Sequence, residues 1–250
     1  MGRENINDSS HWFSSWFDSP YYPMLYHHRN EEEAREFIRR LHEFLELPHG
    51  AEVLDLCCGS GRHSRTLGQL GYRVTGIDLS PSSIAIAKEL SQPPQQYEVQ
   101  DMRSFKLNKS FSAVFNLFTS FGYFTDRTDN LRVLKCIAMH IKPEGLLVID
   151  YLNAYPLLDL SKQVNEYQFD GVSFHTSKFR SDGFIVKEIE VKDGDRVIHF
   201  REQVQLLLPS DFSVLLEEVG FEVVNTFGNY LLEEYSSEIS ERCIIIARKS

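Results

Sequence analysis

The sequence of 250 residues has no long apolar run and few cysteines. No apolar stretch approaches the roughly 20 residues of a membrane span, and the first 20 residues lack the apolar core of a signal peptide. These absences predict a cytoplasmic protein that makes no contact with membranes. The four cysteines have neither zinc-site spacing nor the density of a disulfide scaffold: Cys57, Cys58, Cys136 and Cys243. We therefore expect reduced thiols and no bound metal.

Basic residues are also scarce. The chain has 26 Lys and Arg against 36 Asp and Glu, a formal net charge of −10. This charge opposes broad attraction to phosphate backbones and anionic surfaces, so nucleic acid is disfavoured as a partner. The hydrophobic content of 42% is enough for the core of one large domain, or of one domain with an insertion.

Helices and strands alternate in the first part of the chain. A helix is expected from Asn30, a capping residue, to about Leu47, with apolar residues at helical spacing: Phe37, Ile38, Leu41, Phe44 and Leu45. Further helices are expected at 62–70, from 81, and at 126–141, between strands at 53–56, 73–78, 97–99, 111–118 and 146–151. The fifth strand is apolar on both faces, as buried parallel strands are. The pattern predicts an α/β fold with a doubly wound, mostly parallel sheet.

The pattern changes after about Asn153. Two strong hairpin signals follow, at 181–183 and 193–194. Apolar residues then alternate with polar ones at Ile198, Phe200, Val204 and Leu206, which predicts an antiparallel sheet with one packed face. A helix from Pro209 to about Val219 and strands at 221–224 and 243–247 complete the chain. We expect a core of 1–153 and 209–250, interrupted by an antiparallel insertion at 154–208.

The segment 53–63, VLDLCCGSGRH, concentrates residues suited to ligand binding. The turn after the first strand of a β-α-β unit faces the ligand crevice, where Gly59 and Gly61 allow a nucleoside to approach the backbone closely. Asp55 and Asp78, at the ends of two adjacent strands, offer acceptors for an ammonium group and for ribose hydroxyls. A tight turn alone would explain the glycines, but with Asp101 also in register a ligand site is the better interpretation.

A dinucleotide site is the alternative, because an acid after the second strand also serves NAD. The dinucleotide fingerprint is Gly-x-Gly-x-x-Gly, whereas this turn has Ser64 at the position of the third glycine. The charge of Asp55 would also lie poorly near a pyrophosphate. An NAD-dependent oxidoreductase is therefore the less favoured interpretation.

Four segments resemble the motifs of class I S-adenosylmethionine-dependent methyltransferases: VLDLCCGSGRH, VTGIDLS, QDMR and FSAVFNLFTSFGYF. The resemblance covers about 30–250 and implies a Rossmann-like fold with S-adenosylmethionine as cofactor. FTSFGYF followed by an antiparallel insertion is most similar to small-molecule N-methyltransferases, such as sugar-amine dimethyltransferases and glycine N-methyltransferase-like enzymes. A small-molecule acceptor, with an amine as one candidate, is implied. Cys57 departs from the motif, which has its first glycine there.

The resemblance also implies roles for single residues. The methionine end of the cofactor would lie on the glycine turn, against Asp55, Cys57, Gly59 and Gly61. His63 would help to close the turn, or would be a histidine at a helix start that faces solvent.

The nucleoside is assigned to the next two strand ends. Asp78 would bind the ribose hydroxyls, and Leu79 would cover the adenine. Asp101 would accept from the adenine amino group, with the Met102 backbone completing that edge. Two residues after the fourth strand would line the sulfonium: Asn116 and Leu117.

The segment 20–29 is rich in aromatics and prolines, which makes it unsuited to a regular helix. It could close over a ligand as part of a lid at 12–47. Tyr21, Tyr26 and Arg29 are candidates for holding the carboxylate of the cofactor, because a guanidinium binds a carboxylate in a bidentate manner. Alternatively the aromatics pack on the core and Arg29 is a surface charge.

Methyl transfer is an in-line displacement, so a general base matters mainly for a protonated acceptor. Tyr123 is the first candidate for orienting or deprotonating the acceptor. Weaker candidates, each of which could be a packed or exposed residue instead, are Tyr151, Asn153, His175 and Tyr230. The insertion is expected to roof the acceptor pocket or to form a dimer interface, so a monomer and a homodimer both stay open. A non-catalytic sensor or scaffold that binds S-adenosylmethionine is the other alternative.

Overall fold

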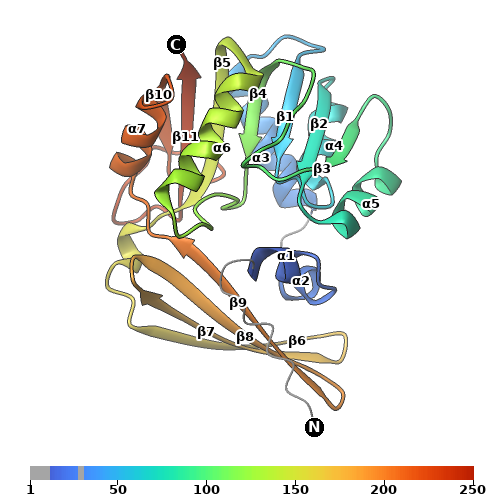
Figure 1. Ribbon diagram of the computed structural model, residues 1–250, viewed down its shortest axis with the longest axis vertical. Helices are drawn as coiled ribbons and strands as arrows, with labels where there is room; N and C mark the ends of the chain where they lie inside the picture. Colours follow the sequence, from blue (N-terminus) through green and yellow to red (C-terminus); the bar gives the residue numbers. More distant parts are fainter. Residues whose placement is uncertain (1–11, 28–30) are drawn as a thin grey trace.

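The computed structural model describes residues 12–27 and 31–250, which form two sheets (Figure 1). The central sheet has the order β10-β11-β5-β4-β1-β2-β3. Its strands are β1 (Glu52–Leu56), β2 (Arg73–Asp78), β3 (Gln96–Val99), β4 (Phe111–Asn116), β5 (Ile141–Leu152), β10 (Phe221–Phe227) and β11 (Arg242–Lys249). β1 to β5 pair in parallel, and β11 is antiparallel to both of its neighbours. The predicted doubly wound, mostly parallel α/β sheet is confirmed.

Alternate residues of the central strands point to opposite faces, and both faces are covered by helices. α3 (Glu31–Leu45) and α4 (Arg62–Gln69) share one hydrophobic cluster with Val53 and Phe115. α6 (Arg127–His140) and α7 (Pro209–Glu217) share the other with Leu54 and Val114. α5 (Pro81–Leu90) packs on β2 and β3. The chain order reverses between β1 and β4, the position where doubly wound sheets bind ligands.

The second sheet is antiparallel and follows a short 3-10 helix, η1 (Tyr155–Leu157). Its strands lie in chain order: β6 (Lys162–Phe169), β7 (Val172–Ser181), β8 (Phe184–Asp193) and β9 (Arg196–Gln205). The two predicted turns are present, and a third turn joins β6 to β7. The predicted antiparallel insertion after the fifth strand is confirmed.

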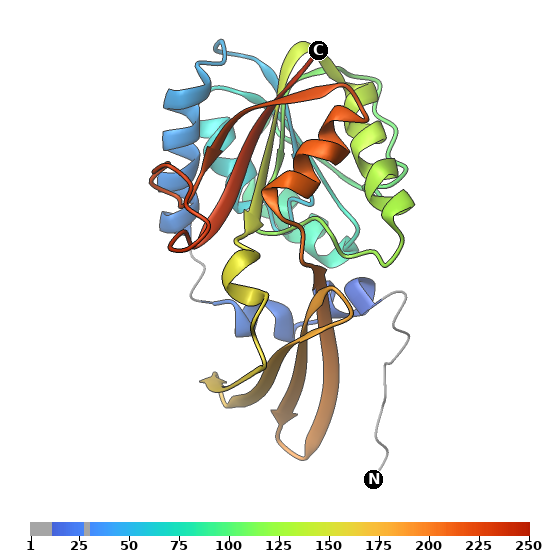
Figure 2. The ribbon, with the colours of Figure 1, turned by 90° about the vertical axis from the view of Figure 1, so that its left-hand side faces the viewer.

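Two short helices, α1 (Trp12–Phe17) and α2 (Tyr21–Leu25), lie between the two sheets (Figures 1 and 2). The expectation that 20–29 avoids helix was wrong for α2. Its prolines precede the helix or lie in the first turn, where a backbone N–H has no helical partner to lose. The ring of Trp16 lies 4.7 Å from that of Phe200, centroid to centroid, so the apolar face of the insertion packs against α1.

The segment 12–47 was expected to form a lid; its last part, α3, packs on the central sheet, and the lid stays a prediction. Phe44, placed in the packed stripe of that helix, is instead 41% exposed, with its ring centroid 5.0 Å from that of Phe227. The predicted cap Asn30 and the candidate Arg29 lie outside the described residues. Among the helices that the structure describes, none is long and apolar enough to cross a membrane.

Candidate functional site

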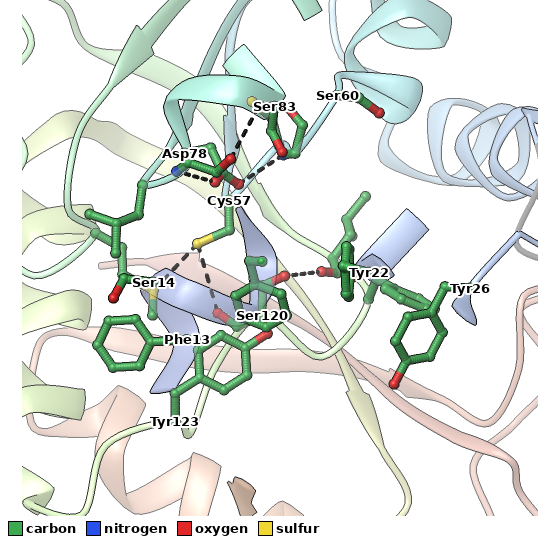
Figure 3. A pocket seen from close by; sticks show the side chains of 18 of the residues that line it. Phe13, Ser14, Tyr22, Tyr26, Cys57, Ser60, Asp78, Ser83, Ser120 and Tyr123 are labelled. Atoms are coloured by element: carbon green, nitrogen blue, oxygen red, sulfur yellow. Dashed lines mark hydrogen bonds between the residues drawn. The ribbon is translucent and has the colours of Figure 1, made fainter. Parts of the chain in front are cut away.

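A cavity of about 260 Å³ lies between the carboxyl ends of the central strands and the helices α1 and α2 (Figure 3). The sheet side is mostly polar and the opposite side is aromatic. Figure 3 shows Asp78 and Tyr123 lying across the cavity from one another. Its aromatic lining includes Phe13, Phe17, Tyr22, Tyr26, Tyr123 and Phe124.

The glycine turn after β1 forms the floor of the cavity. Gly59 lines it in a left-handed conformation, with φ of 54°, and a Cβ there would meet no atom within 4 Å. Its backbone therefore faces open space, as binding of a ligand against the main chain requires. Gly61 is the N-cap of α4 and does not line the cavity: a Cβ there would lie 3.0 Å from the Tyr97 hydroxyl. Gly61 is needed for close packing behind the turn.

Asp78 lines the cavity at the end of β2 and also braces the glycine turn. Its Oδ2 accepts the Gly59 N–H at 2.8 Å, and its Oδ1 accepts the Ser80 N–H at 2.9 Å. Burial raises the pKa of Asp78 above its ordinary value, although these N–H groups act in the opposite direction. Each carboxylate oxygen keeps a lone pair for a further donor, so the side chain suits ribose hydroxyls.

Asp55 does not line the cavity, contrary to the expectation of direct contact with the methionine end. It is 1% exposed, and its Oδ2 accepts the Ser64 hydroxyl at 2.5 Å. Burial raises the pKa of Asp55 to about 6, with the Ser64 hydrogen bond opposing the shift. Asp55 therefore supports the turn from behind.

His63 and Cys57 lie along the same turn and line the cavity. The alternative of a solvent-facing His63 is wrong, because it is 8% exposed, and burial holds its pKa well below the usual range. The imidazole is therefore neutral at pH 7. Cys57 adopts a φ of 64°, and its Sγ lies 3.4 Å from the Met102 Sδ. Burial raises the pKa of the Cys57 thiol well above its ordinary value, which excludes a reactive thiolate.

The nucleoside candidates after β2 and β3 all line the cavity: Asp78, Leu79, Asp101 and Met102. Leu79 is 37% exposed, at the rim. Burial acts to raise the pKa of Asp101, but the hydrogen bonds and charge of Arg103 outweigh it and lower the pKa. The carboxylate of Asp101 is thus ionised, and Arg103 fixes its orientation through Nε at 3.0 Å.

The two residues expected to line the sulfonium differ in position. Leu117 lines the cavity, whereas Asn116 does not. The Asn116 amide donates to the carbonyls of Leu56 and Ser120, so it ties β1 to the loop after β4. Its role in the structure is to fix that loop.

The two tyrosine candidates of the expected lid also differ in position. Tyr26 lines the cavity, and its hydroxyl donates to Glu202 of β9. Tyr21 does not line it; its hydroxyl donates to Asp193 at 2.9 Å, so the structure does not bring Tyr21 to the cavity. A helix turns successive side chains by about 100°, which explains why Tyr21 and Tyr22 differ.

Tyr123 lines the cavity with its ring 5.3 Å from that of Trp12. Burial raises the pKa of Tyr123 well above its ordinary value, so the phenol stays protonated and cannot serve as a base near neutral pH. The weaker candidates lie elsewhere: Tyr151 donates to the Gln205 carbonyl, Asn153 to Ser237 and Ser240, and Tyr230 to Asp150, while His175 is exposed beside Glu166.

The sequence reasoning missed part of the aromatic lining: Phe13, Phe17, Tyr22 and Phe124. The density of aromatic residues in WFSSWF was the available signal. Aromatic residues at helical spacing are most often core residues, and here they pack as a core and line the cavity at once.

Comparisons with known proteins identify relatives of this chain. Residues 26–226 match the family model of a methyltransferase domain. A glycine/sarcosine N-methyltransferase of Aphanothece halophytica is 29% identical over 90% of this chain and 84% of its own. A dTDP-3-amino-3,6-dideoxy-alpha-D-glucopyranose N,N-dimethyltransferase of Streptomyces fradiae is 32% identical over 50% of this chain and 46% of its own. The fold matches an S-adenosylmethionine-dependent methyltransferase structure from Clostridium acetobutylicum with a TM-score of 0.78, at 19% identity over 92% of this chain and 96% of that one.

The fold and the cavity at its strand ends define a Rossmann-like α/β protein with a ligand site. The chain belongs to the methyltransferase family. The predicted enzyme class, an S-adenosylmethionine-dependent methyltransferase, and its cofactor are confirmed. Family membership leaves the NAD-dependent alternative without support.

Proposed function

We propose that this methyltransferase carries the methyl group of S-adenosylmethionine to the amine nitrogen of a small-molecule acceptor. The observation that carries the proposal is the cavity itself, which joins the polar strand ends to an aromatic side closed by the helices α1 and α2. A single cavity with both linings suits a charged nucleoside beside a compact acceptor.

The residues present fit the cofactor. Open space at Gly59 admits a ligand against the backbone, and the carboxylates of Asp78 and Asp101 suit ribose hydroxyls and an adenine amino group. We assign the nucleoside to these groups together with Leu79 and Met102. The methionine end then lies along Cys57, Gly59 and the loop that contains Leu117.

When bound, S-adenosylmethionine would supply a methyl group on a sulfonium: the lone pair of the acceptor nitrogen would bond to the methyl carbon as the carbon–sulfur bond breaks, with S-adenosylhomocysteine as the leaving group and the positive charge passing to nitrogen. The task of the protein is therefore alignment and exclusion of water. Aromatic rings stabilise positive charge on nitrogen through their π faces, which favours an amine over a neutral hydroxyl acceptor. Tyr123 and Tyr22 supply such rings, and the protonated Tyr123 phenol orients the acceptor without removing its proton.

The relatives favour an amine as well, because the two named above are an amino-sugar N,N-dimethyltransferase and a glycine/sarcosine N-methyltransferase. An amine acceptor also needs no strong base, since it reacts from its neutral form. This agrees with the cavity, where the lining tyrosines, cysteines and His63 are all poor bases or neutral near pH 7.

The test is a panel assay with S-adenosylmethionine that measures S-adenosylhomocysteine formed. The panel contains nucleotide-linked amino sugars, glycine, sarcosine and primary amines, each matched with its hydroxyl counterpart. We expect turnover with amines alone, and Tyr123→Phe should lower kcat while the affinity for S-adenosylhomocysteine stays constant. Turnover confined to hydroxyl acceptors would contradict the amine proposal. Binding of S-adenosylhomocysteine without turnover on any acceptor would favour the sensor alternative.

A further inference from the structure

The loop after β4, residues 117–120, has an unusual backbone. Phe118 and Thr119 are consecutive, neither is glycine, and both have φ of 57°. L residues rarely adopt this left-handed region, and two in succession persist only where the surroundings enforce them. Leu117, Phe118 and Ser120 of this loop line the cavity. The enforced conformation therefore determines part of the shape of the site.

The carboxylate that enforces it comes from β5. The Asp150 Oδ2 accepts the Phe118 N–H at 2.8 Å, and the Asp150 carbonyl accepts the Thr119 N–H at 2.8 Å. Asp150 is 1% exposed and does not line the cavity, so it acts on the site only through the loop.

Two further side chains hold Asp150 in turn. Arg242 of β11 donates from Nε to the Asp150 Oδ1 at 2.7 Å and from Nη2 to the Thr119 Oγ1 at 2.8 Å. The Tyr230 hydroxyl donates to the Asp150 Oδ2 at 3.1 Å. Tyr230 is itself fixed, because its ring lies 4.4 Å from that of Phe37 on α3.

We propose that Asp150, with Arg242 and Tyr230, is a positioning residue of the methyl-transfer site, which holds the loop 117–120 in the conformation that binds the cofactor. A buried ion pair is poor at adding stability, because desolvation offsets most of its attraction. It does fix geometry, because one planar guanidinium donates to both the Asp150 carboxylate and the Thr119 hydroxyl and so sets their relative orientation. The ring of Phe118, stacked below the Arg62 guanidinium at 4.7 Å, is the cavity-lining group that this network places.

The test compares variants of the network with a matched control outside it. Tyr230→Phe removes only the hydroxyl that holds Asp150. The control is Tyr235→Phe, which removes a comparable hydrogen bond, to the Asn153 Oδ1 at 2.8 Å. The stronger variant is Asp150→Asn with Arg242→Gln, which removes the network while leaving no uncompensated buried charge.

Two measurements on the full chain separate positioning from mere support of the fold. Calorimetry with S-adenosylhomocysteine gives the affinity per folded site, and hydrogen exchange gives the protection of the Phe118 amide without any ligand. We expect the affinity to fall about threefold in Tyr230→Phe and at least about tenfold in the double variant, with faster exchange at Phe118 in both. Tyr235→Phe should change neither, and Arg242→Lys, which keeps the charge, should retain more affinity than the double variant.

The ligand measurement rests on the proposed function, but the exchange measurement does not. If the unmodified protein fails to bind S-adenosylhomocysteine, the proposed function is wrong, and exchange at Phe118 alone decides on the network. If the unmodified protein binds and the variants match it in affinity and in exchange at Phe118, the positioning role is wrong. Lower stability with unchanged affinity per folded site would likewise overturn it.

Discussion

The two sides of the cavity are built in different ways. The polar side comes from residues at strand ends of one sheet, where Asp78 and Gly59 lie 19 positions apart in the chain and share a hydrogen bond of 2.8 Å. The aromatic side comes mostly from the segment of α1 and α2, joined by Tyr123 and Phe124 of the loop after β4. That segment is held by a strand about 180 residues later, because Trp16 and Tyr26 both donate to Glu202. The polar side is set by local sequence, and the aromatic side is set by long-range packing.

Each side is backed by a carboxylate that does not line the cavity. Asp55 lies behind the glycine turn and Glu202 lies behind the aromatic rings. If the comparison holds, changes on the polar side should alter cofactor affinity, and changes on the aromatic side should leave it nearly constant.

The largest effect is expected for Asp78→Ala. It removes the acceptor for two ribose hydroxyls, each charge-assisted hydrogen bond being worth about 1.5–3 kcal/mol, and it also releases the Gly59 N–H. The affinity for S-adenosylhomocysteine, measured by calorimetry, should fall at least about tenfold. Asp78→Asn, which keeps one acceptor oxygen, should lose less. Affinity unchanged in both variants would remove Asp78 from the site.

The second effect is a pH dependence of stability at Asp55. Burial raises the pKa of Asp55 to about 6 in the folded protein, against 3.8 for the unperturbed group. Between these values the folded protein keeps a proton that the unfolded chain has lost, so the stability of the unmodified protein falls as the pH rises. Asp55→Asn lacks this loss. Its free energy of unfolding relative to the unmodified protein should therefore rise by roughly 2 kcal/mol between pH 4 and 6, since one pKa unit corresponds to about 1.4 kcal/mol and the titrations of the two states are only partly complete at the ends of this range.

Urea denaturation at a series of pH values measures this difference. Asp126→Asn is the control, because Asp126 is an exposed helix cap and hydrogen bonds from Thr128 lower its pKa. In the folded protein it titrates below the window, so its difference from the unmodified protein should change by a few tenths of a kcal/mol at most, and in the opposite direction, between pH 4 and 6. A constant difference for Asp55→Asn would show that Asp55 is ionised throughout.

The strands of the polar side were predictable, and so were most of its residues. The limits of β2 at Arg73 and Asp78 follow from the apolar run between them, and the glycine turn follows from VLDLCCGSGRH. The sequence did not show that Asp55 and Gly61 lie behind the turn. The order of residues alone does not say which of them face the cavity and which face the protein interior. That distinction depends on Ser64 and Tyr97, which pack there only in the folded chain.

The aromatic side was mostly missed, for a physical reason. α1 and α2 have 6 and 5 residues, too short to be stable as isolated helices. They form because Trp16 and Phe200 bury one another, and because Glu202 accepts from both helical segments. Neither contact has a signal in the local sequence.

The identity of the acceptor, the oligomeric state, the cytoplasmic location and the lack of nucleic-acid partners stay predictions.

A moderate effect on stability is expected for Glu202→Gln. The glutamine keeps one acceptor oxygen but loses the charge that strengthens the bonds from Trp16 and Tyr26, at a cost of about 1–2 kcal/mol. Denaturation should show this loss, while the affinity for S-adenosylhomocysteine changes less than about threefold. Glu188→Gln on the adjacent strand, an exposed position, is the control and should change neither. A large loss of affinity in Glu202→Gln would show that the two sides are coupled.

The smallest effect is expected for Tyr21→Phe, which separates the two faces of α2. The Tyr21 hydroxyl donates to Asp193 at the far end of β8 and does not line the cavity, whereas its neighbour Tyr22 does. Losing that bond should cost about 0.5–1.5 kcal/mol of unfolding free energy and leave the affinity for S-adenosylhomocysteine within twofold. Tyr22→Ala, which removes a ring from the lining, should instead alter turnover of whichever amine the panel identifies. A tenfold loss of cofactor affinity in Tyr21→Phe would mean that the face of α2 that carries Tyr21, which points away from the cavity, contacts the cofactor. The assignment of the aromatic side to the acceptor would then be wrong.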